Sequence, residues 1–467
     1  MELSPKKTKI VATIGPGSES VEMLTKLLKA GINVARCNMS HGDHAEHRAR
    51  MENIRKVSDS LGLPLPILQD LAGPKIRTGS YSTERITIET GKEITLTTED
   101  IVGDEHRISI NYEKLPQEVG PGSIIMLDDG KKKLEVVSAS GKEILCKIIV
   151  GGELKSRRGV NIPGAYLSIS SITDKDKEDL KFGAEVGVDF VALSFVRRAA
   201  DVLELKRLLK EVGKDTPVIS KIETRESIDN LDEIIAASDG VMVARGDLAI
   251  EVPTEEVPLL QKRIIKSANL LGKPVITATQ MLESMISSPV PTRAEVSDVA
   301  NAIVDGTDAV MLSEESALGK YPVEAVAMMT RIAETIEVSL KKEKKPIVGV
   351  VDSISESISY LSRKIGATLI VALTESGSTA QMVARYKPNA PIIALTPHRD
   401  TVERLTLTSG VYPYQIAPLG SVDHAVEFLP GFLIDKGFAN KGDKIVVAAG
   451  LNFGVKGATN MLFSIEL

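Results

Sequence analysis

Short apolar runs rich in β-branched residues alternate with longer amphipathic stretches through most of this 467-residue chain. The alternation is typical of parallel strands that are each followed by a helix covering the sheet. Eight runs have the length expected of buried strands: Ile10–Ile14, Asn33–Asn38, Leu65–Asp70, Asp189–Phe195, Pro217–Ile222, Gly240–Ala244, Pro274–Ala278 and Asp308–Leu312. Eight strand-helix units in this order predict an α/β fold built on a (β/α)₈ barrel.

The segments between the runs predict the helices of the outer layer. Val21–Ala30 and Val202–Val212 are amphipathic, and a further helix is expected from Pro322 to Leu340. Pro322 then lies in the first turn, where proline costs no hydrogen bond.

The pattern of apolar and polar residues changes between the third and fourth runs. Segments there alternate apolar and polar residues as antiparallel strands do, and turns are expected at Asp129-Gly130 and Ser140-Gly141. The segments are Arg85–Thr98, Arg107–Tyr112, Ser123–Leu127 and Lys132–Val150. We therefore expect an inserted small β-barrel domain at residues 73–164, and a barrel made of residues 1–72 and 165–340.

The strand and helix alternation restarts after the basic run Lys341–Lys345. Apolar runs at Leu369–Leu373, Ile392–Leu395 and Lys444–Ala449 predict a C-terminal open α/β domain over residues 341–467. Three domains fit a chain of this length, because a single core stops growing well before it.

The composition limits which classes of partner the protein is expected to bind and which cellular compartment suits it. The formal charge is -6, and no basic stripe is present, so a nucleic-acid or membrane partner is not expected. Cys37 and Cys146 lack the spacing of a zinc site, which fits a reducing, cytoplasmic setting. No secretion signal and no apolar run of the roughly 20 residues that span a bilayer is found.

Charged groups follow the expected fifth and sixth strands. Working residues of such barrels lie at the C-terminal strand ends, and Lys221 and Glu223, two apart on a strand, point to one side. With Asp247 nearby, two carboxylates suit Mg²⁺ and the ammonium suits a transferring phosphoryl group. A buried structural ion cluster is the alternative.

The second and third strands also end in polar groups. Arg36 can bind a phosphate with two hydrogen bonds, and Asn38, Ser40 and Asp70 offer oxygen atoms to a cation. Ordinary hydrogen bonding at the barrel mouth explains these residues equally well.

Three histidines follow, but they do not predict a zinc site. His41, His44 and His47 straddle an expected helix start near Asp43, and we expect His44 and His47 on a solvated helix face. No cysteine or spaced carboxylate completes a metal site. The chain also lacks a G-x-x-x-x-G-K-[ST] loop, so any nucleotide is bound in another way.

A hydroxyl-rich loop lies in the expected C-terminal domain. Thr374, Ser376, Ser378 and Thr379, together with Gly377, precede a helix expected from Ala380 to Tyr386. Hydroxyls and free N–H groups at a helix start form an anion site, here a phosphate site. Plain capping of the helix by one hydroxyl is the alternative.

At this point the motifs match a known family, because the chain resembles pyruvate kinases over nearly its whole length. The matching stretches are Arg36–Gly42, Gly73–Gly79, Gly159–Gly164, Lys221–Glu223, Arg245–Glu251, Thr279–Met285 and Pro291–Leu312. The resemblance implies a catalytic barrel, an inserted lid, a regulatory α/β domain, a homotetramer and a cytoplasmic enzyme. It also implies the reaction of phosphoenolpyruvate with ADP to give pyruvate and ATP.

The resemblance assigns roles to residues of the barrel. Lys221 would stabilise the phosphoryl group in transfer, and Glu223 and Asp247 would bind Mg²⁺. Thr279 would lie beside the enolate face. The substrate carboxylate would bind N–H groups near Gly246.

Other implied roles concern phosphate and nucleotide. Arg36 would contact phosphate. The nucleotide side would be lined by Asn38, His41, Arg77 and Arg158, the last of these approaching from the lid.

The chain departs from the family pattern at Lys75. Potassium-requiring members resemble it at Asn38, Ser40, Asp70 and the Leu71 carbonyl, but carry a glutamate at the position of Lys75. A lysine ammonium can replace the monovalent cation, so activity without K⁺ is expected. If Lys75 points into solvent, K⁺ still binds.

Two further departures concern Glu375 and Glu314. The hydroxyl-rich loop contains no lysine or arginine, and Glu375 opposes a second phosphate. A sugar monophosphate, a nucleotide monophosphate such as AMP, or no effector at all is expected. A small residue is common in the family at Glu314, and no role follows for it.

Two rival functions remain open at this stage. One is a Mg²⁺-dependent, enolate-forming barrel lyase or aldolase, which would share Glu223 and Asp247 but would not need Arg158. The other is a non-catalytic sugar-phosphate sensor. The intact Lys221 and Thr279 disfavour a sensor.

Overall fold

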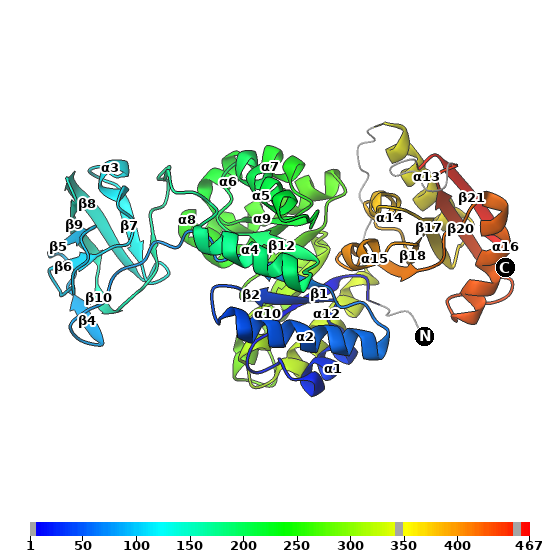
Figure 1. The fold of residues 1–467 in the computed structure, drawn as a ribbon, viewed down its shortest axis with the longest axis horizontal. Coiled ribbons are helices and arrows are strands. Elements are labelled where there is room, and N and C mark those ends of the chain that lie inside the picture. The colour runs from blue at the N-terminus through cyan, green and yellow to red at the C-terminus, as the bar shows by residue number, and fades with distance from the viewer. Residues whose placement is uncertain (1–5, 341–348, 452–458) are drawn as a thin grey trace.

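Eight parallel strands close into a barrel at the centre of the molecule, with further parts on either side (Figure 1). The structure, a computed structural model, describes residues 6–340, 349–451 and 459–467, so the basic run Lys341–Lys345 lies outside it. Around the ring the strands are β1 (Lys9–Thr13), β16 (Ala309–Leu312), β15 (Val275–Ala278), β14 (Gly240–Ala244), β13 (Val218–Ile222), β12 (Phe190–Leu193), β3 (Ile67–Asp70) and β2 (Val34–Asn38).

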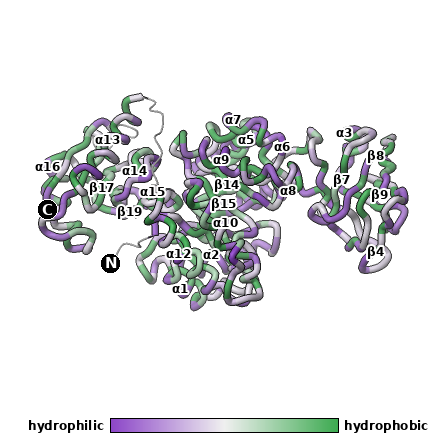
Figure 2. The backbone as a smooth tube through the Cα atoms, turned by 180° about the vertical axis from the view of Figure 1, so that it is seen from behind, coloured by the Kyte–Doolittle hydropathy of each residue, from purple (hydrophilic) through white to green (hydrophobic). Residues whose placement is uncertain are grey.

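All eight predicted strands are confirmed, with ends that differ by one or two residues. Each strand pairs in parallel with both neighbours, for example Lys221 opposite Met242. The C-terminal ends therefore all face the same way, towards the inserted segment. Figure 2 shows β14 and β15 as hydrophobic stretches through the middle of the barrel.

An outer layer of helices covers the strands. Its members are α1 (Val21–Ala30), α2 (His44–Leu61), α4 (Asp174–Val186), α5 (Ala199–Glu211), α6 (Arg225–Asp229), α7 (Leu231–Ala237), α8 (Arg245–Glu251), α9 (Val257–Leu270), α10 (Arg293–Val304), α11 (Glu314–Ala317) and α12 (Pro322–Glu337), with short 3₁₀ turns at Thr254–Glu256 and Glu283–Ile286. The helix predicted at Val21–Ala30 has those bounds, and α12 begins at Pro322 as expected.

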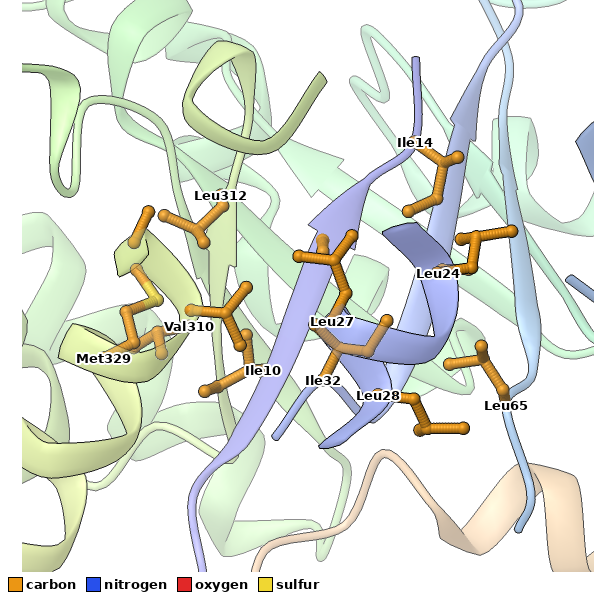
Figure 3. Packing of buried hydrophobic residues seen from close by; sticks show 14 of the residues in the cluster. Ile10, Ile14, Leu24, Leu27, Leu28, Ile32, Leu65, Val310, Leu312 and Met329 are labelled. Carbon is orange, nitrogen blue, oxygen red and sulfur yellow. The ribbon is translucent and has the colours of Figure 1, made fainter. Parts of the chain in front are cut away.

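Aliphatic side chains fill the space between strands and helices. Figure 3 shows Leu27 of α1 on the side of Ile10 of β1, Leu24 of α1 near Ile14, and Met329 of α12 beside Val310 of β16. Burying one such side chain contributes about 1.5–3 kcal/mol. This layer fixes the helices on the strands and so holds the strand ends in place.

Helix α2 begins as the sequence predicts, at a capping box. The Asp43 carboxylate accepts the N–H groups of Ala45 and Glu46, both at 2.9 Å, which fixes the helix start. The expectation of a solvated face is wrong for His47. Its ring is buried and its Nε2 lies 2.8 Å from the His41 carbonyl, because the chain before the helix folds back over it.

The segment between β3 and α4 forms the expected β domain, which stands away from the barrel (Figure 1). Its strands divide between a six-stranded and a two-stranded sheet around one apolar core. The elements are β4 (Arg85–Ile88), β5 (Glu93–Thr97), β6 (Arg107–Ser109), α3 (Leu115–Glu118), β7 (Ile124–Leu127), β8 (Lys132–Ser140), β9 (Glu143–Val150), β10 (Gly152–Lys155) and β11 (Val160–Asn161).

The C-terminal part is an open five-stranded sheet flanked by helices, with order β19-β18-β17-β20-β21. Strand β21 runs antiparallel to β20 and the other pairs are parallel. The elements are α13 (Val350–Lys364), β17 (Leu369–Leu373), α14 (Ser378–Ala384), β18 (Ile392–Thr396), α15 (Arg399–Leu405), β19 (Val411–Gln415), α16 (Val422–Asp435), β20 (Lys444–Ala449) and β21 (Met461–Glu466).

The C-terminal part packs against the N-terminal end of the barrel. Leu407 belongs to the same buried cluster as Val11, Ile219 and the other side chains inside the barrel. Nearby, the buried Lys9 donates from Nζ to the Val411 carbonyl at 2.6 Å. The C-terminal part therefore closes the N-terminal end of the barrel.

Candidate active site

The C-terminal end of β13 places an ammonium group between carboxylates. Lys221 Nζ lies 3.4 Å from Glu223 Oε2 and 3.6 Å from Asp70 Oδ1. Asp247, in the first turn of α8, is close enough to affect both Lys221 and Glu223 electrostatically. The three residues predicted from adjacent strand ends are thus brought together.

Burial and charge act against each other at Lys221 and Asp70. Burial by itself would lower the pKa of Lys221, but Asp70, Glu223 and Asp247 outweigh it and raise that pKa. At Asp70 burial would raise the pKa, but the positive charges of Lys221 and Arg36 lower it. The ammonium and the Asp70 carboxylate therefore stay ionised as a pair.

Glu223 is the carboxylate with an open position. Its Oε1 accepts the Phe195 N–H at 2.6 Å, while its buried Oε2 has no hydrogen-bond partner among the described residues. Burial, which outweighs the attraction of Lys221, raises the pKa of Glu223 to about 7. A buried oxygen without a partner is costly unless it serves a ligand.

These oxygen atoms fit a Mg²⁺ ion. Mg²⁺ takes one or two carboxylates and completes its shell with water and substrate oxygens. Glu223 supplies Oε2, which has no hydrogen-bond partner among the described residues. Asp247 lines the cavity between the inserted domain and the barrel. Within the described ranges no group of three or more His, Cys, Asp or Glu side chains is placed to hold a metal.

Ser194, at the end of β12, was missed by the sequence analysis. Its hydroxyl accepts a hydrogen bond from Lys221 Nζ at 2.8 Å and donates to the Leu71 carbonyl at 2.7 Å. It thereby links Lys221 to the strand end at Asp70. A polar residue that ends an apolar run was the signal that could have identified it.

Arg36 is held in place by its neighbours on β1 and β3. Its Nε donates to Asp70 Oδ2 at 2.7 Å, and its Nη1 donates to Thr13 Oγ1 at 2.8 Å. A guanidinium group has five N–H donors, so Arg36 retains the capacity to bind an anion at the barrel mouth.

Thr279 and Gly246 meet where β14 and β15 end. The Gly246 N–H donates to Thr279 Oγ1 at 2.8 Å, and Thr279 has a φ of +69°. Arg245 stabilises this unusual turn by donating to the Ala278 and Thr279 carbonyls at 3.1 and 2.7 Å. Arg245 was not singled out from the sequence, because its partners are 33 and 34 residues away.

A cavity of about 230 Å³ lies between the inserted domain and the barrel. Lys75, Arg77 and Arg158 line it from the inserted side, and Asp247 lines it from the barrel. Arg158 Nε lies 3.4 Å from Asp128 Oδ1. The predicted nucleotide residues Arg77 and Arg158 therefore face the same space as the carboxylate site.

Asn38, Ser40 and His41 lie at the end of β2. Asn38 Oδ1 accepts the Ser40 N–H at 3.1 Å, and His41 is exposed. Burial of part of the ring lowers the pKa of His41, and the positive charges of Lys75, Arg77 and Arg36 lower it further. Lys75 therefore lies within electrostatic range of both His41 and Asp70.

Glu251 was also missed. It ends α8, lines the cavity and is held by the Arg225 N–H and by the Asn161 side chain of the inserted domain. Burial raises the pKa of Glu251 to about 7. It ends the matching stretch Arg245–Glu251, but no strand end marks it, and its contact with Asn161 comes from the inserted domain.

The hydroxyl-rich loop precedes α14, which starts two residues earlier than expected. Thr374 Oγ1 accepts the Gly377 N–H at 2.9 Å, and Thr379 Oγ1 lies 2.6 Å from Thr459 Oγ1. Ser376 and Ser378 hydrogen-bond to each other. Glu375 is paired with His398 at 2.7 Å.

The fold is a (β/α)₈ barrel of the kind that enzymes use, and its strand ends bring Lys221, Glu223 and Asp247 together. The chain matches the family described as "Pyruvate kinase, barrel domain" over residues 5–326. It also matches "Pyruvate kinase, alpha/beta domain" over residues 352–463. The chain belongs to the pyruvate kinase family, and it is therefore a phosphotransferase.

Individual relatives agree with this assignment. Pyruvate kinase 2 of Synechocystis sp. is 47% identical over 465 residues, which cover 98% of this chain and 79% of that protein. The pyruvate kinase of Bacillus licheniformis is 47% identical over 467 residues, covering 98% and 80%. A crystal structure of a Cryptosporidium parvum pyruvate kinase superposes with a TM-score of 0.93 at 35% identity, covering 99% of this chain and 96% of that one.

Proposed function

We propose that this chain transfers the phosphoryl group of phosphoenolpyruvate to ADP and so forms pyruvate and ATP. The observation that carries the proposal is the Lys221 ammonium, which lies 3.4 Å from Glu223 Oε2, a buried oxygen with no hydrogen-bond partner among the described residues. Phosphoryl transfer requires charge neutralisation and positioning more than covalent chemistry. This site offers both.

Each charged residue of the site has its own role in the proposed reaction. Lys221 stabilises charge on the phosphoryl group in transfer, and Arg36, held by Asp70, orients the substrate phosphate. Glu223 and Asp247 would hold Mg²⁺. When bound, the ion supplies positive charge that neutralises the phosphoryl oxygens.

Thr279 and Gly246 would position the other end of the substrate. Backbone N–H groups in the first turn of α8 can receive a carboxylate, because they lie at the positive end of the helix. The Thr279 hydroxyl accepts the Gly246 N–H at 2.8 Å and donates to the Ala278 carbonyl at 2.7 Å, so it would have to turn away from that carbonyl to donate to the enolate face.

The nucleotide would bind on the inserted-domain side. Arg77 and Arg158 face the cavity, while Asn38 and His41 lie at the end of β2. Arg158 belongs to the inserted domain, so movement of this domain as a lid would bring its charge to the phosphates.

Lys75 would take the place of a monovalent cation. It affects Asp70 electrostatically, and the Leu71 carbonyl beside Asp70 is already bonded to Ser194. We therefore propose that Mg²⁺ is required and K⁺ is not.

For the C-terminal loop we propose a ligand with one phosphate, either a sugar monophosphate or AMP, or no effector. Glu375 is paired with His398, and the hydroxyls of Ser376 and Ser378 bond to each other at 3.3 Å, a contact that a phosphate could replace. Rates titrated with ribose 5-phosphate, AMP and fructose 1,6-bisphosphate test this. Strong activation by the bisphosphate alone refutes it.

The assembly and setting are proposed from the family resemblance. They are a homotetramer in the cytoplasm, with no nucleic-acid or membrane partner. The described part of the chain contains no helix that is both long and apolar enough to cross a bilayer.

An assay of ADP-dependent pyruvate formation tests the proposed reaction. Lys221→Ala is expected to lower kcat by about 10²- to 10³-fold, since it removes one charge-stabilising group. Lys206→Ala, which removes an outer lysine paired with Asp239, is the matched control and keeps full activity. Pyruvate formation without ADP would instead indicate a lyase or aldolase, and unchanged turnover in Lys221→Ala would refute the assigned role.

A further inference from the structure

Two stretches of chain join the inserted domain to the barrel, residues 72–76 on the way out and residues 162–171 on the return (Figure 1). Both pass the loop Phe195-Val196-Arg197, which connects β12 to α5. No motif marks this loop. Its contacts nevertheless reach the proposed metal site and both connections.

Phe195 makes three contacts in three directions. Its N–H donates to Glu223 Oε1 at 2.6 Å, and its carbonyl accepts the Ser171 hydroxyl at 3.0 Å. Its ring packs against Gly73, where an added Cβ would lie only 2.8 Å from Phe195 Cδ2. One residue thus touches the metal carboxylate and both connections of the inserted domain.

The backbone of Phe195 is strained. Its φ is +54°, in the left-handed region that bulky side chains seldom adopt. Such a conformation persists only where the surroundings impose it, and it is concentrated at functional sites. Here the strain directs the N–H of Phe195 at Glu223.

Arg197 anchors the returning connection. Its Nη1 donates to the Leu167 carbonyl at 2.7 Å, and its Nη2 donates to the Ile169 carbonyl and, at 3.3 Å, to Ser171 Oγ. The backbone of Arg197 is itself fixed, because its N–H donates to Asp201 Oδ2 at 2.9 Å. The connection is therefore attached to a rigid point of the barrel.

We propose that the loop Phe195–Arg197 couples the position of the inserted domain to the orientation of the Glu223 carboxylate. Phe195 and Arg197 are positioning residues that act through Glu223. The inference rests on the proposed function, in which Glu223 binds the metal. Coupling is reciprocal, so metal binding at Glu223 also tightens residues 167–171.

The first experiment removes one link of this chain of contacts. Ser171→Ala deletes the hydroxyl that binds the Phe195 carbonyl, and Ser170→Ala is the matched control, because the Ser170 hydroxyl bonds to Ile172 and to no other described residue. Isothermal titration of the full chain with Mn²⁺, without substrate, is expected to show about 3- to 10-fold weaker binding in Ser171→Ala only. Equal Mn²⁺ affinity in the two variants overturns the proposal.

A second set of variants separates positioning from simple destabilisation. Arg197→Met is expected to weaken Mn²⁺ binding, and Arg197→Lys to restore part of it, since lysine keeps a donor for the carbonyls. Arg207→Met, on the outer surface of α5, is the control and leaves binding unchanged. An equal loss in Arg197→Met and Arg197→Lys contradicts the positioning role.

Glu223→Gln distinguishes failure of the coupling from failure of the proposed site. Unchanged Mn²⁺ affinity in Glu223→Gln would refute the metal site and the coupling with it. If Glu223→Gln weakens binding while Ser171→Ala does not, the coupling alone is wrong.

A further measurement follows the returning connection directly. Hydrogen exchange of the amides of residues 167–171 is expected to slow when Mn²⁺ is added, and this slowing is expected to vanish in Glu223→Gln. Exchange that is unaffected by Mn²⁺ in the wild type overturns the proposal.

Discussion

Asp70 collects positive charge from three directions at the residue scale. Arg36 is bonded to it at 2.7 Å, Lys221 lies 3.6 Å away, and Lys75 acts on it over a longer distance. A carboxylate that is already neutralised has little need of a further cation. Asp70 is thus already paired with two cations, and the exposed Lys75 adds positive charge from a greater distance.

We predict that wild-type activity in sodium- and potassium-free buffer changes little when KCl is added. Lys75→Glu is expected to gain a K⁺ requirement of about tenfold or more, because reversing a charge near the site changes its electrostatic energy by about 1–2 kcal/mol. Rates measured with and without KCl, using tetramethylammonium to hold ionic strength, test this.

Lys155→Glu is the matched control, because Lys155 is an exposed lysine of the inserted domain far from Asp70 in the sequence. It is expected to keep the wild-type response to KCl. A many-fold K⁺ requirement in the wild type, or no change in Lys75→Glu, would contradict the prediction.

At the scale of elements, the connection that leads from the barrel to the inserted domain, residues 72–76, contains the closely packed Gly73. Gly73 has a φ of +65° and contacts Ser194 and Phe195, so an alanine there would meet both strain and side chains. Gly164, at the returning connection, has a φ of +77° with nothing within 4 Å of an added Cβ. Both glycines have a positive φ, but of the two only Gly73 is closely packed. Comparing their alanine variants therefore distinguishes the effect of backbone strain from the effect of packing.

We predict that Gly73→Ala lowers the free energy of unfolding by about 1–3 kcal/mol and lowers kcat/KM, since strain and overpacking add. Gly164→Ala is expected to cost about 1 kcal/mol and to leave kcat/KM unchanged. Urea unfolding and steady-state rates distinguish them. Similar kinetics in both variants would mean that the contact with Phe195 is unimportant.

Strand prediction succeeded where strands are buried on both faces. The eight barrel strands are continuous apolar runs, and each was identified. The two strands that were missed in the C-terminal sheet, β19 and β21, are its edges. Pro413 interrupts β19, and both carry exposed polar residues, so neither gives the apolar run of a central strand.

The site was predictable only where local position carries the information. Lys221, Glu223 and Asp247 follow apolar runs, and barrel geometry brings such ends together. Arg197 and Glu251 depend on contacts with the connections and with Asn161 of the inserted domain. No spacing within the sequence encodes those contacts, because they arise only after the insert is placed over the barrel.

At the scale of the whole molecule, a buried carboxylate lies between the barrel and the C-terminal part. Glu403 of α15 has no hydrogen-bond partner for its Oε2 among the described residues, and Asp189 of the barrel lies nearby. Burial, and then the negative charge of Asp189, raise the pKa of Glu403 to about 7. This group makes the contact between the two parts sensitive to pH.

The direction of the pH effect on stability follows from the number of protons that the folded and unfolded states bind. Between about pH 4.5 and 7 the folded protein keeps a proton on Glu403 that the unfolded chain has released, so stability falls as pH rises through that window. We predict that Glu403→Gln is more stable than wild type by about 1–3 kcal/mol at pH 8 and equal to it near pH 5.

Urea unfolding at the two pH values measures the difference. Glu324→Gln, an exposed glutamate on α12, is the control and shows no such pH dependence. A Glu403→Gln variant that is less stable than wild type at pH 8 would show that the charged carboxylate is stabilising.

The position of Leu407 has a consequence for dividing this protein into pieces. Because this residue of the C-terminal part completes the packing inside the barrel, a chain truncated after α12 would expose Val11 and Ile219 to water. The inserted domain has its own core and leaves the barrel through two adjacent connections. A minimal version of the enzyme scaffold should therefore be made by replacing the insert with a short loop, keeping the tail intact.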